Sequence, residues 1–145
     1  MILDSNDANI ATLHRLSDLG VSIAMDDFGV GYSSLSYLHC FPFDRIKIDR
    51  SFVTNMITRR EPLFIVRAIL GLCRDLNVQT TVEGVETAEQ LAILSREKAS
   101  DVQGYFFSRP LPAQKLAAFL ANWRSPLLAQ EHKKLAAAVV EAAEI

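Results

Sequence analysis

Short apolar runs alternate with amphipathic segments along this chain. The runs have the composition of buried strands and are too short to be helices. They cover residues 21–25, 45–49, 78–82 and 102–107. The amphipathic segments predict helices over residues 7–19, 33–39, 62–76, 87–96, 116–123 and 127–144. Strands that alternate with helices pair in parallel and are covered by those helices, so the sequence predicts an α/β fold with a parallel sheet.

Particular residues mark the expected ends of these helices. Gly20 ends the first helix, and Pro62 is suited to the first position of the third. Asn77 suits the left-handed position that follows a helix end. Thr87 and Gln90 have the spacing of a capping box, in which each side chain bonds the backbone N–H of the other.

Composition limits the function further. A chain of 145 residues is one domain or part of one, and 50% hydrophobic residues suffice for a core. A formal charge of −2 without a basic tract argues against a nucleic-acid polymer as partner. Cys40 and Cys73 lie far apart, so we expect reduced thiols. No segment has the pattern of a membrane span or an export signal, and we expect a cytoplasmic protein.

Two adjacent carboxylates, Asp26 and Asp27, follow the first predicted strand. Successive side chains of a strand point to opposite faces, so a continuing strand would separate them. Gly29 and Gly31 permit a bend that brings both carboxylates to one target. A divalent cation is the usual partner of such a pair. The alternative is a solvated Asp-Asp turn without a ligand.

Polar residues also stand at the ends of the later strands. They are Lys47, Glu83 and Gln103, each within otherwise apolar strand sequence. The carboxyl ends of parallel strands meet at one mouth, so these side chains and the Asp pair predict a shared site. Taken alone, Lys47 would be interpreted first as one half of a structural ion pair. Glu83 alone could likewise be a carboxylate near the start of a helix.

Several motifs in this order resemble the EAL domain family. They are Asp26–Leu35, Lys47–Asp49, Glu83–Thr87, Gln103–Tyr105 and Ser108–Pro110. The resemblance implies a (β/α)8 barrel that hydrolyses cyclic di-GMP to the linear dinucleotide with Mg²⁺ or Mn²⁺, in bacterial signal transduction. It also implies that the family's dimerisation loop corresponds to Gly29, Val30, Gly31, Tyr32 and Ser33.

The same resemblance suggests individual roles. Asp26 and Asp27 become metal ligands, and Lys47 holds the attacking water or a phosphate oxygen. Glu83 becomes a metal ligand or the general base that acts on this water. Gln103 orients the site. The other expected substrate-binding or orienting residues are Phe28, Gly104 and Arg109, although a structural role is favoured for Arg109, as for Asp49 and Glu86.

The chain also departs from the family pattern. The Glu-x-Leu motif and the metal ligands of the earlier strands are absent, so we expect the C-terminal half of a barrel over residues 1–124 and an amphipathic helix over 125–145. Val30 stands where Thr is usual. Lys98-Ala99-Ser100 stands where Gly-Cys-Asp is usual, which predicts the loss of a polar contact near the ligand.

Three hypotheses follow from this partial match. The chain is a phosphodiesterase fragment that is weak or inactive alone, or a non-catalytic module that binds cyclic di-GMP or another EAL domain. The third is a half-barrel whose main property is self-association. Four parallel strands leave two open edges and, we expect, an uncovered apolar interior. Both features predict a homodimer or pairing with another EAL-type chain.

Overall fold

The computed structural model describes residues 7–30, 38 and 40–123. Its elements are α1 (Asp7–Asp18), β1 (Ala24–Phe28), β2 (Arg45–Ile48), α3 (Arg50–Thr54), α4 (Arg60–Asp75), β3 (Gln79–Val82), α5 (Ala88–Arg96), β4 (Asp101–Val102) and α6 (Ala113–Asn122). Residues 1–107 form one compact unit, which holds the sheet, and residues 108–145 form a second, which holds α6. The predicted helix over 127–144 and nearly all of the helix over 33–39 lie outside the described residues.

The sheet has four strands in the order β1-β2-β3-β4, and every neighbouring pair is parallel. Lys47 of β2 is paired with Thr81 of β3, and Thr81 is paired in turn with Asp101 of β4. Each strand follows its neighbour in sequence. The helices α3 and α4 connect β2 to β3, and α5 connects β3 to β4. The predicted α/β fold with a parallel sheet is therefore confirmed.

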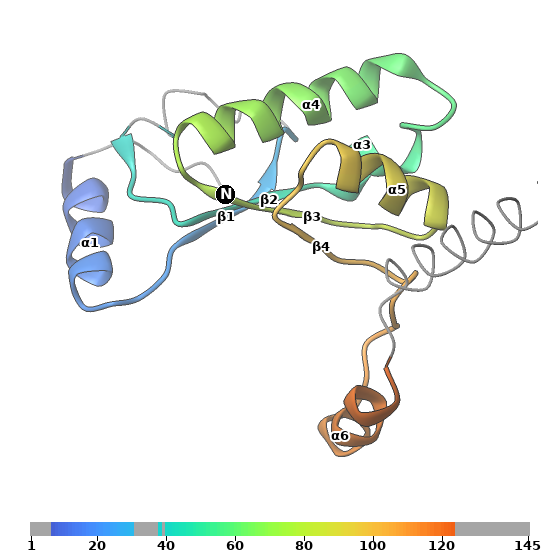
Figure 1. The fold of residues 1–145 in the computed structure, drawn as a ribbon. Coiled ribbons are helices and arrows are strands. Elements are labelled where there is room, and N and C mark those ends of the chain that lie inside the picture. The colour runs from blue at the N-terminus through green and yellow to red at the C-terminus, as the bar shows by residue number, and fades with distance from the viewer. Residues whose placement is uncertain (1–6, 31–37, 39, 124–145) are drawn as a thin grey trace, which may run out of the picture. The chain divides into compact units, whose positions relative to one another are not determined.

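The helices α3, α4 and α5 lie on one side of this sheet (Figure 1). Between them and the sheet lies a core in which Ile46, Ile48, Val66, Val82 and Leu91 are fully buried. Burial of one such side chain stabilises the fold by roughly 1.5–3 kcal/mol, so this single layer carries most of the packing energy. No described helix has the length and hydropathy that a membrane span requires.

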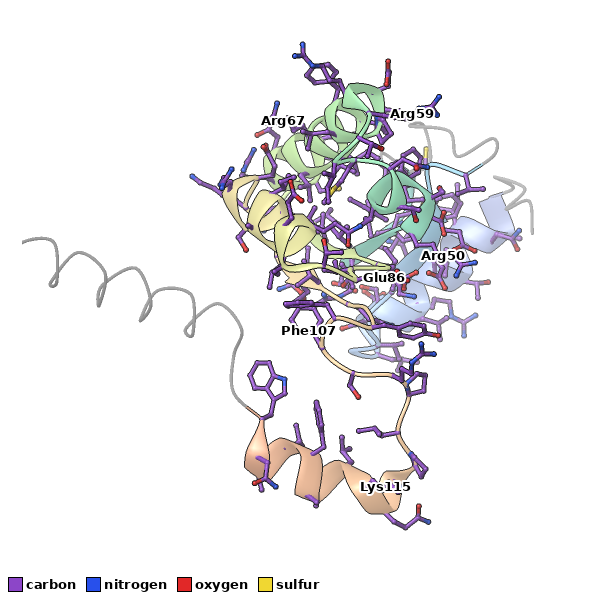
Figure 2. The ribbon with its side chains drawn as sticks, turned by 90° about the vertical axis from the view of Figure 1, so that its right-hand side faces the viewer. Arg50, Arg59, Arg67, Glu86, Phe107 and Lys115 are labelled. Atoms are coloured by element: carbon purple, nitrogen blue, oxygen red, sulfur yellow. The ribbon has the colours of Figure 1, made fainter. Side chains whose placement is uncertain are left out.

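An ion pair ties two of these helices together on the outside. Arg67 of α4 contacts Glu97 at the end of α5, with 2.7 Å between Nη2 and Oε1. Figure 2 shows Arg67 on the outer side of the helix layer. The pair is partly exposed, so its contribution is about 0.2–1 kcal/mol.

The opposite face of the sheet is polar. The side chains of Arg45 and Lys47 alternate with those of Ile46 and Ile48, and so point away from the helix layer. Arg45 forms an ion pair with Asp101 across the sheet and donates a hydrogen bond of 2.8 Å to Thr81 Oγ1. The expected apolar interior is therefore wrong, because that face carries charged residues that pair with one another, such as Arg45 and Asp101, beside polar ones such as Thr81.

Two strand boundaries differ from prediction. β1 begins at Ala24 rather than at Val21, because the Val21 amide donates to the Leu16 carbonyl and closes the turn after α1. β4 ends at Val102, although we predicted a strand to residue 107. A turn replaces it, in which the Phe107 amide donates to the Gly104 carbonyl at 3.1 Å.

The helix ends follow the predicted chemistry closely. Asn77 has φ 57° beyond α4, and both hydrogen bonds of the Thr87–Gln90 capping box are present at α5. Pro62 was expected at the first helical position but is the third residue of α4. An N–H group at this position would have no carbonyl acceptor within the helix, so proline loses no helical hydrogen bond there. The short helix α3 was not predicted. Its cap is Asp49, whose carboxylate accepts from the Ser51 amide at 2.9 Å.

Candidate active site

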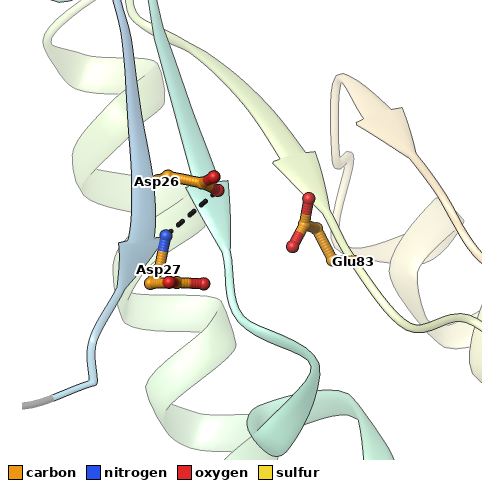
Figure 3. Close-up of side chains that lie close together, drawn as sticks. All are labelled: Asp26, Asp27 and Glu83. Atoms are coloured by element: carbon orange, nitrogen blue, oxygen red, sulfur yellow. Dashed lines mark hydrogen bonds between the residues drawn. The ribbon is translucent and has the colours of Figure 1, made fainter.

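Three carboxylates meet at the carboxyl end of the sheet. Asp26 and Asp27 come from β1, and Glu83 directly follows β3 (Figure 3). One oxygen atom from each lies within 4.8 Å of the others. Asp26 and Asp27 are exposed and Glu83 is half-buried. The edge predicted from the strand ends therefore does bring these acidic residues together.

A bulge in β1 places both aspartates at this edge. The strand pairing advances from residue 25 to 28 along β1 but only from 46 to 48 along β2. Asp26 and Asp27 therefore stand opposite the single residue Lys47, which is the arrangement of a β-bulge. Asp27 has φ 51°, in the left-handed region that aspartate tolerates better than most residues. Its amide donates to Asp26 Oδ1 at 3.2 Å.

The predicted cause of this convergence was different. We expected Gly29 and Gly31 to bend the chain, but the bulge precedes both of them. Gly29 has φ 96°, and a Cβ atom there would lie 2.7 Å from ring atoms of Phe52 in α3. Gly29 thus allows the close approach of the loop to α3. Gly31, with Tyr32 and Ser33 of the expected dimerisation loop, lies outside the described residues.

Lys47 lies between two of the carboxylates. Its Nζ is 2.7 Å from Asp26 Oδ1 and 2.6 Å from Glu83 Oε1. The hydrogen bond from Lys47 holds the pKa of Asp26 below its ordinary value. Hydrogen bonds to Asp26 and then Glu83 raise the pKa of Lys47 above its ordinary value. The structural ion pair that the sequence left open for Lys47 is therefore present, and it lies within the candidate site.

The other expected site residues lie in varied surroundings. Phe28 is 3% exposed and packs in the core below the site. Gln103 is exposed just after β4, and its backbone amide donates to the Val82 carbonyl at 2.9 Å. A Cβ atom at Gly104 would lie 2.0 Å from the Val85 carbonyl oxygen, so this glycine is required for packing.

The comparison with the family pattern also involved Arg109 and Ser100. Arg109 belongs to the second compact unit, and its expected role stays a prediction. Ser100 precedes β4, at the amino-terminal edge of the sheet, and its Oγ accepts from the Thr80 amide at 3.2 Å. Ser100, which stands where the family usually has Asp, therefore lies at the opposite edge of the sheet from Asp27 and Glu83 and not near them.

The polar network beside the site was missed in the sequence. Arg45 lies on the same face of β2 as Lys47, two residues earlier, and joins β3 and β4 through Thr81 and Asp101. Charged and isoleucine residues alternate along Arg45–Ile48. A period of two along β2 is the signal that would have placed Arg45 on the open face.

The donor set fits a hard divalent cation. Mg²⁺ and Ca²⁺ take oxygen ligands at roughly 2.0–2.6 Å, so two ligands of one ion can be up to about 5 Å apart. The oxygen atoms of Asp26, Asp27 and Glu83 satisfy this limit without rearrangement of the backbone. The ammonium group of Lys47 contacts two of these carboxylates and would compete with such an ion for them.

Known proteins match this chain closely. A family model described as EAL domain matches residues 1–110. The cyclic di-GMP phosphodiesterase NbdA of Pseudomonas aeruginosa is 46% identical over 118 residues, which are 81% of this chain and 15% of NbdA. The Pseudomonas aeruginosa PaMucR phosphodiesterase in its c-di-GMP complex has a TM-score of 0.74 and 42% identity, over 79% of this chain and 46% of that one.

A third match includes a metal. The Klebsiella pneumoniae BlrP1 manganese/cy-diGMP complex has a TM-score of 0.67 and 38% identity, over 72% of this chain and 26% of that chain. This chain thus spans less than half of either solved chain. The described sheet and its helices have the fold expected for half of a TIM-like barrel.

Proposed function

This chain belongs to the EAL domain family, and from that membership we propose that it forms part of a site that hydrolyses cyclic di-GMP to the linear dinucleotide. One observation carries the proposal. Asp26, Asp27 and Glu83 offer oxygen atoms within 4.8 Å of one another at the mouth of the sheet. The names of NbdA and of the PaMucR and BlrP1 complexes support the same substrate.

We assign the three carboxylates to a Mg²⁺ or Mn²⁺ ion. Asp26, Asp27 and Glu83 would hold it, since carboxylate oxygens suit both metals. The chemistry that such an ion supplies when bound is neutralisation of phosphate oxygens and a lower pKa for water. The manganese in the BlrP1 complex supports the choice of metal. The chain's own contribution is a donor set that the β1 bulge fixes in place.

Lys47 and Glu83 would act on the water and the phosphate. An ammonium group has three N–H donors, and Asp26 and Glu83 accept from Lys47 Nζ. A remaining donor is available to the attacking water or to a phosphate oxygen. Glu83 would accept the proton of that water as general base. Gln103 is exposed just beyond β4 and would orient the substrate with its amide.

Residues around this centre would support it less directly. Phe28 and Gly104 would position the site through packing, since each lies against neighbouring residues of the same unit. Arg109 remains a candidate for a substrate contact. Gly29 and Val30, with the loop residues that follow them, would couple the site to a dimer interface.

We also propose an assembly and a compartment. β1 and β4 are the outer strands of the described sheet, so pairing with a second copy or with another EAL-type chain would extend the sheet at its edges. Cys40 and Cys73 are both free thiols, which suits the reducing cytoplasm. Cell fractionation would test the compartment.

The alternative function is a module that binds cyclic di-GMP without hydrolysing it. The observation that favours it is the size of the donor set. Three carboxylates supply only part of a six-coordinate shell, so further ligands of the first ion, and those of any second ion, would have to come from elsewhere. The two functions share the ligand and differ in turnover.

A chimera separates these possibilities. Residues 1–110 would replace the matching segment of the PaMucR phosphodiesterase. We expect Mn²⁺-dependent hydrolysis of cyclic di-GMP by this chimera and its loss in the Asp27→Asn version. A folded chimera that binds the dinucleotide without hydrolysing it would favour the binding module. A folded chimera that does neither would overturn both. The chain alone should turn over far below the rate of about 1 per second typical of enzymes.

A further inference from the structure

A pocket lies at the opposite edge of the sheet from the carboxylates. Its volume is about 240 Å³. It is bounded by the end of α4, the start of β3 and the turn that leads from α5 to β4. The lining residues that matter here are Arg74, Asn77, Thr80, Lys98 and Ser100. None of them belongs to the candidate active site.

The charge of this pocket is positive and uncompensated. Arg74 and Lys98 line it, and no acidic side chain is among its lining residues. Within the described part of the chain neither cation has an ion-pair partner. The hydroxyl groups of Thr80 and Ser100 also line the pocket. Thr80 Oγ1 donates to Ser100 Oγ at 3.4 Å, which leaves the Ser100 hydroxyl proton available to a ligand. Cations and hydroxyl groups around one cavity are the donors that proteins use for phosphate groups.

Neither cation is needed to hydrogen-bond the carbonyl groups at the helix ends. Basic residues are common at helix ends, where they stabilise the last carbonyl groups. At the end of α4, however, the amides of Asn77 and Val78 already donate to last-turn carbonyls at 3.0 and 2.8 Å. At the end of α5, the amides of Lys98 and Ala99 donate to last-turn carbonyls at 3.2 and 3.1 Å. The backbone thus satisfies these carbonyls without either side chain.

The backbone conformation of Lys98 also indicates that its side chain has a function in ligand binding. Its φ is 60°, a left-handed conformation that glycine adopts freely and lysine rarely. The equivalent positions after α1 and α4 are occupied by Gly20 and Asn77, the residues that favour this conformation. A lysine at this position is therefore explained better by what its ammonium group binds than by the turn itself.

We propose that this pocket binds a phosphate group, with the Arg74 guanidinium and the Lys98 ammonium as its cationic donors. The guanidinium can donate two parallel hydrogen bonds to phosphate oxygens, and the ammonium contributes a point charge. The Ser100 and Thr80 hydroxyl groups complete the polar lining. Free phosphate and the phosphate of a nucleotide share this chemistry, and the test below distinguishes them.

The test is an NMR titration of the full chain with inorganic phosphate and, separately, with guanosine monophosphate. We expect saturable shifts of the Gln79 and Ser100 amides. Tighter binding of the nucleotide would identify a nucleotide ligand, and equal binding would identify the phosphate group alone. Absence of saturable shifts with both probes would overturn the proposal.

Variants make the test specific. Lys98→Gly and Arg74→Gln should each weaken phosphate binding roughly tenfold, as expected for a lost charge-assisted hydrogen bond. Lys98→Gly relieves a left-handed lysine, so its thermal midpoint should rise and its loss of binding cannot be ascribed to unfolding. Arg15→Gln is the matched control, since Arg15 stands in the last turn of α1, as Arg74 does in α4. Unchanged affinity in Lys98→Gly, or an equal loss in Arg15→Gln, would contradict the assignment.

Discussion

The substitution Lys47→Met should destabilise the metal-free chain by about 2 kcal/mol at neutral pH. The Asp26 carboxylate is 63% exposed, so its pair with Lys47 contributes about 0.5 kcal/mol. Glu83 is only 20% exposed, and without Lys47 its carboxylate is left largely desolvated, at a cost of about 1.5 kcal/mol. Methionine keeps the length of the apolar stem. The measurement is urea unfolding followed by circular dichroism in the presence of a chelator.

A divalent ion should reverse this loss. Without the ammonium group, three carboxylates remain within 4.8 Å and attract a cation more strongly. An excess of Mn²⁺ at about 100 times its dissociation constant would add roughly 2.7 kcal/mol, enough to restore the variant. Arg45→Met is the matched control, because it removes an ion pair with Asp101 on the same face but leaves the three carboxylates unchanged.

The difference between Lys47→Met and the unsubstituted chain should depend on pH. Lys47 lowers the pKa of Asp26 in the folded state, so this contribution is present above the unfolded pKa of about 4 and is lost as the pH falls through the lower folded value. The pKa of Lys47 is raised, so the contribution is present below about pH 10.4 and is lost as the pH rises through the folded value. We therefore expect the stability difference between the two chains to be constant between these limits and to decrease toward zero outside them.

Two results would refute this reasoning. One is a Lys47→Met chain as stable as the unsubstituted chain in chelator at neutral pH, which would mean that the two ion pairs contribute nothing. The other is equal stabilisation of Lys47→Met and Arg45→Met at the same Mn²⁺ concentration, which would mean that the Lys47 ammonium group does not compete with the ion for the carboxylates.

Four further outcomes are expected. Asp27→Asn should remove most of the Mn²⁺ affinity in calorimetric titration and Asp49→Asn should not, because Asp49 caps α3; equal losses would contradict the carboxylate assignment. Gly104→Ala should destabilise the chain by about 3 kcal/mol or more through its clash with the Val85 backbone. Gly71→Ala, within α4, should gain up to about 1 kcal/mol in the same urea series, because the added Cβ would meet Arg74 Nη2 at 3.9 Å, an ordinary contact distance. Sedimentation should show a dimer at high protein concentration, and a monomer throughout would exclude edge pairing.

Local chemistry explains which parts of the fold were predictable. Asn77 and the Thr87–Gln90 pair interact only with residues a few positions away, so their spacing alone identifies them as helix ends. The strand order follows in the same way, because alternating strands and helices leave few arrangements. The meeting of Asp27 and Glu83 at one edge is a consequence of that order.

Other features depend on contacts between distant segments. The bulge at Asp26 and Asp27 is defined by the pairing with β2, and no local signal distinguishes it from a glycine bend. β4 stops at Val102 because Gly104 packs against the backbone of Val85, nineteen residues earlier. Both errors arise where a tertiary contact overrides the local pattern of apolar residues.

The polar open face changes how an isolated sheet of this kind should behave. Exposed apolar strands would cost burial energy and drive strong association, whereas Arg45, Lys47 and their carboxylate partners remain solvated and paired in water. The core between the sheet and α4 is complete without cover on that face, since Ile46 and Ile48 are already fully buried. Association with a second chain would therefore rest on backbone hydrogen bonds at the edges of β1 and β4 and on charge complementarity across the open face. Salt screens the charge pairs but not the backbone hydrogen bonds, so any dimer should weaken at high ionic strength, whereas an apolar interface would not.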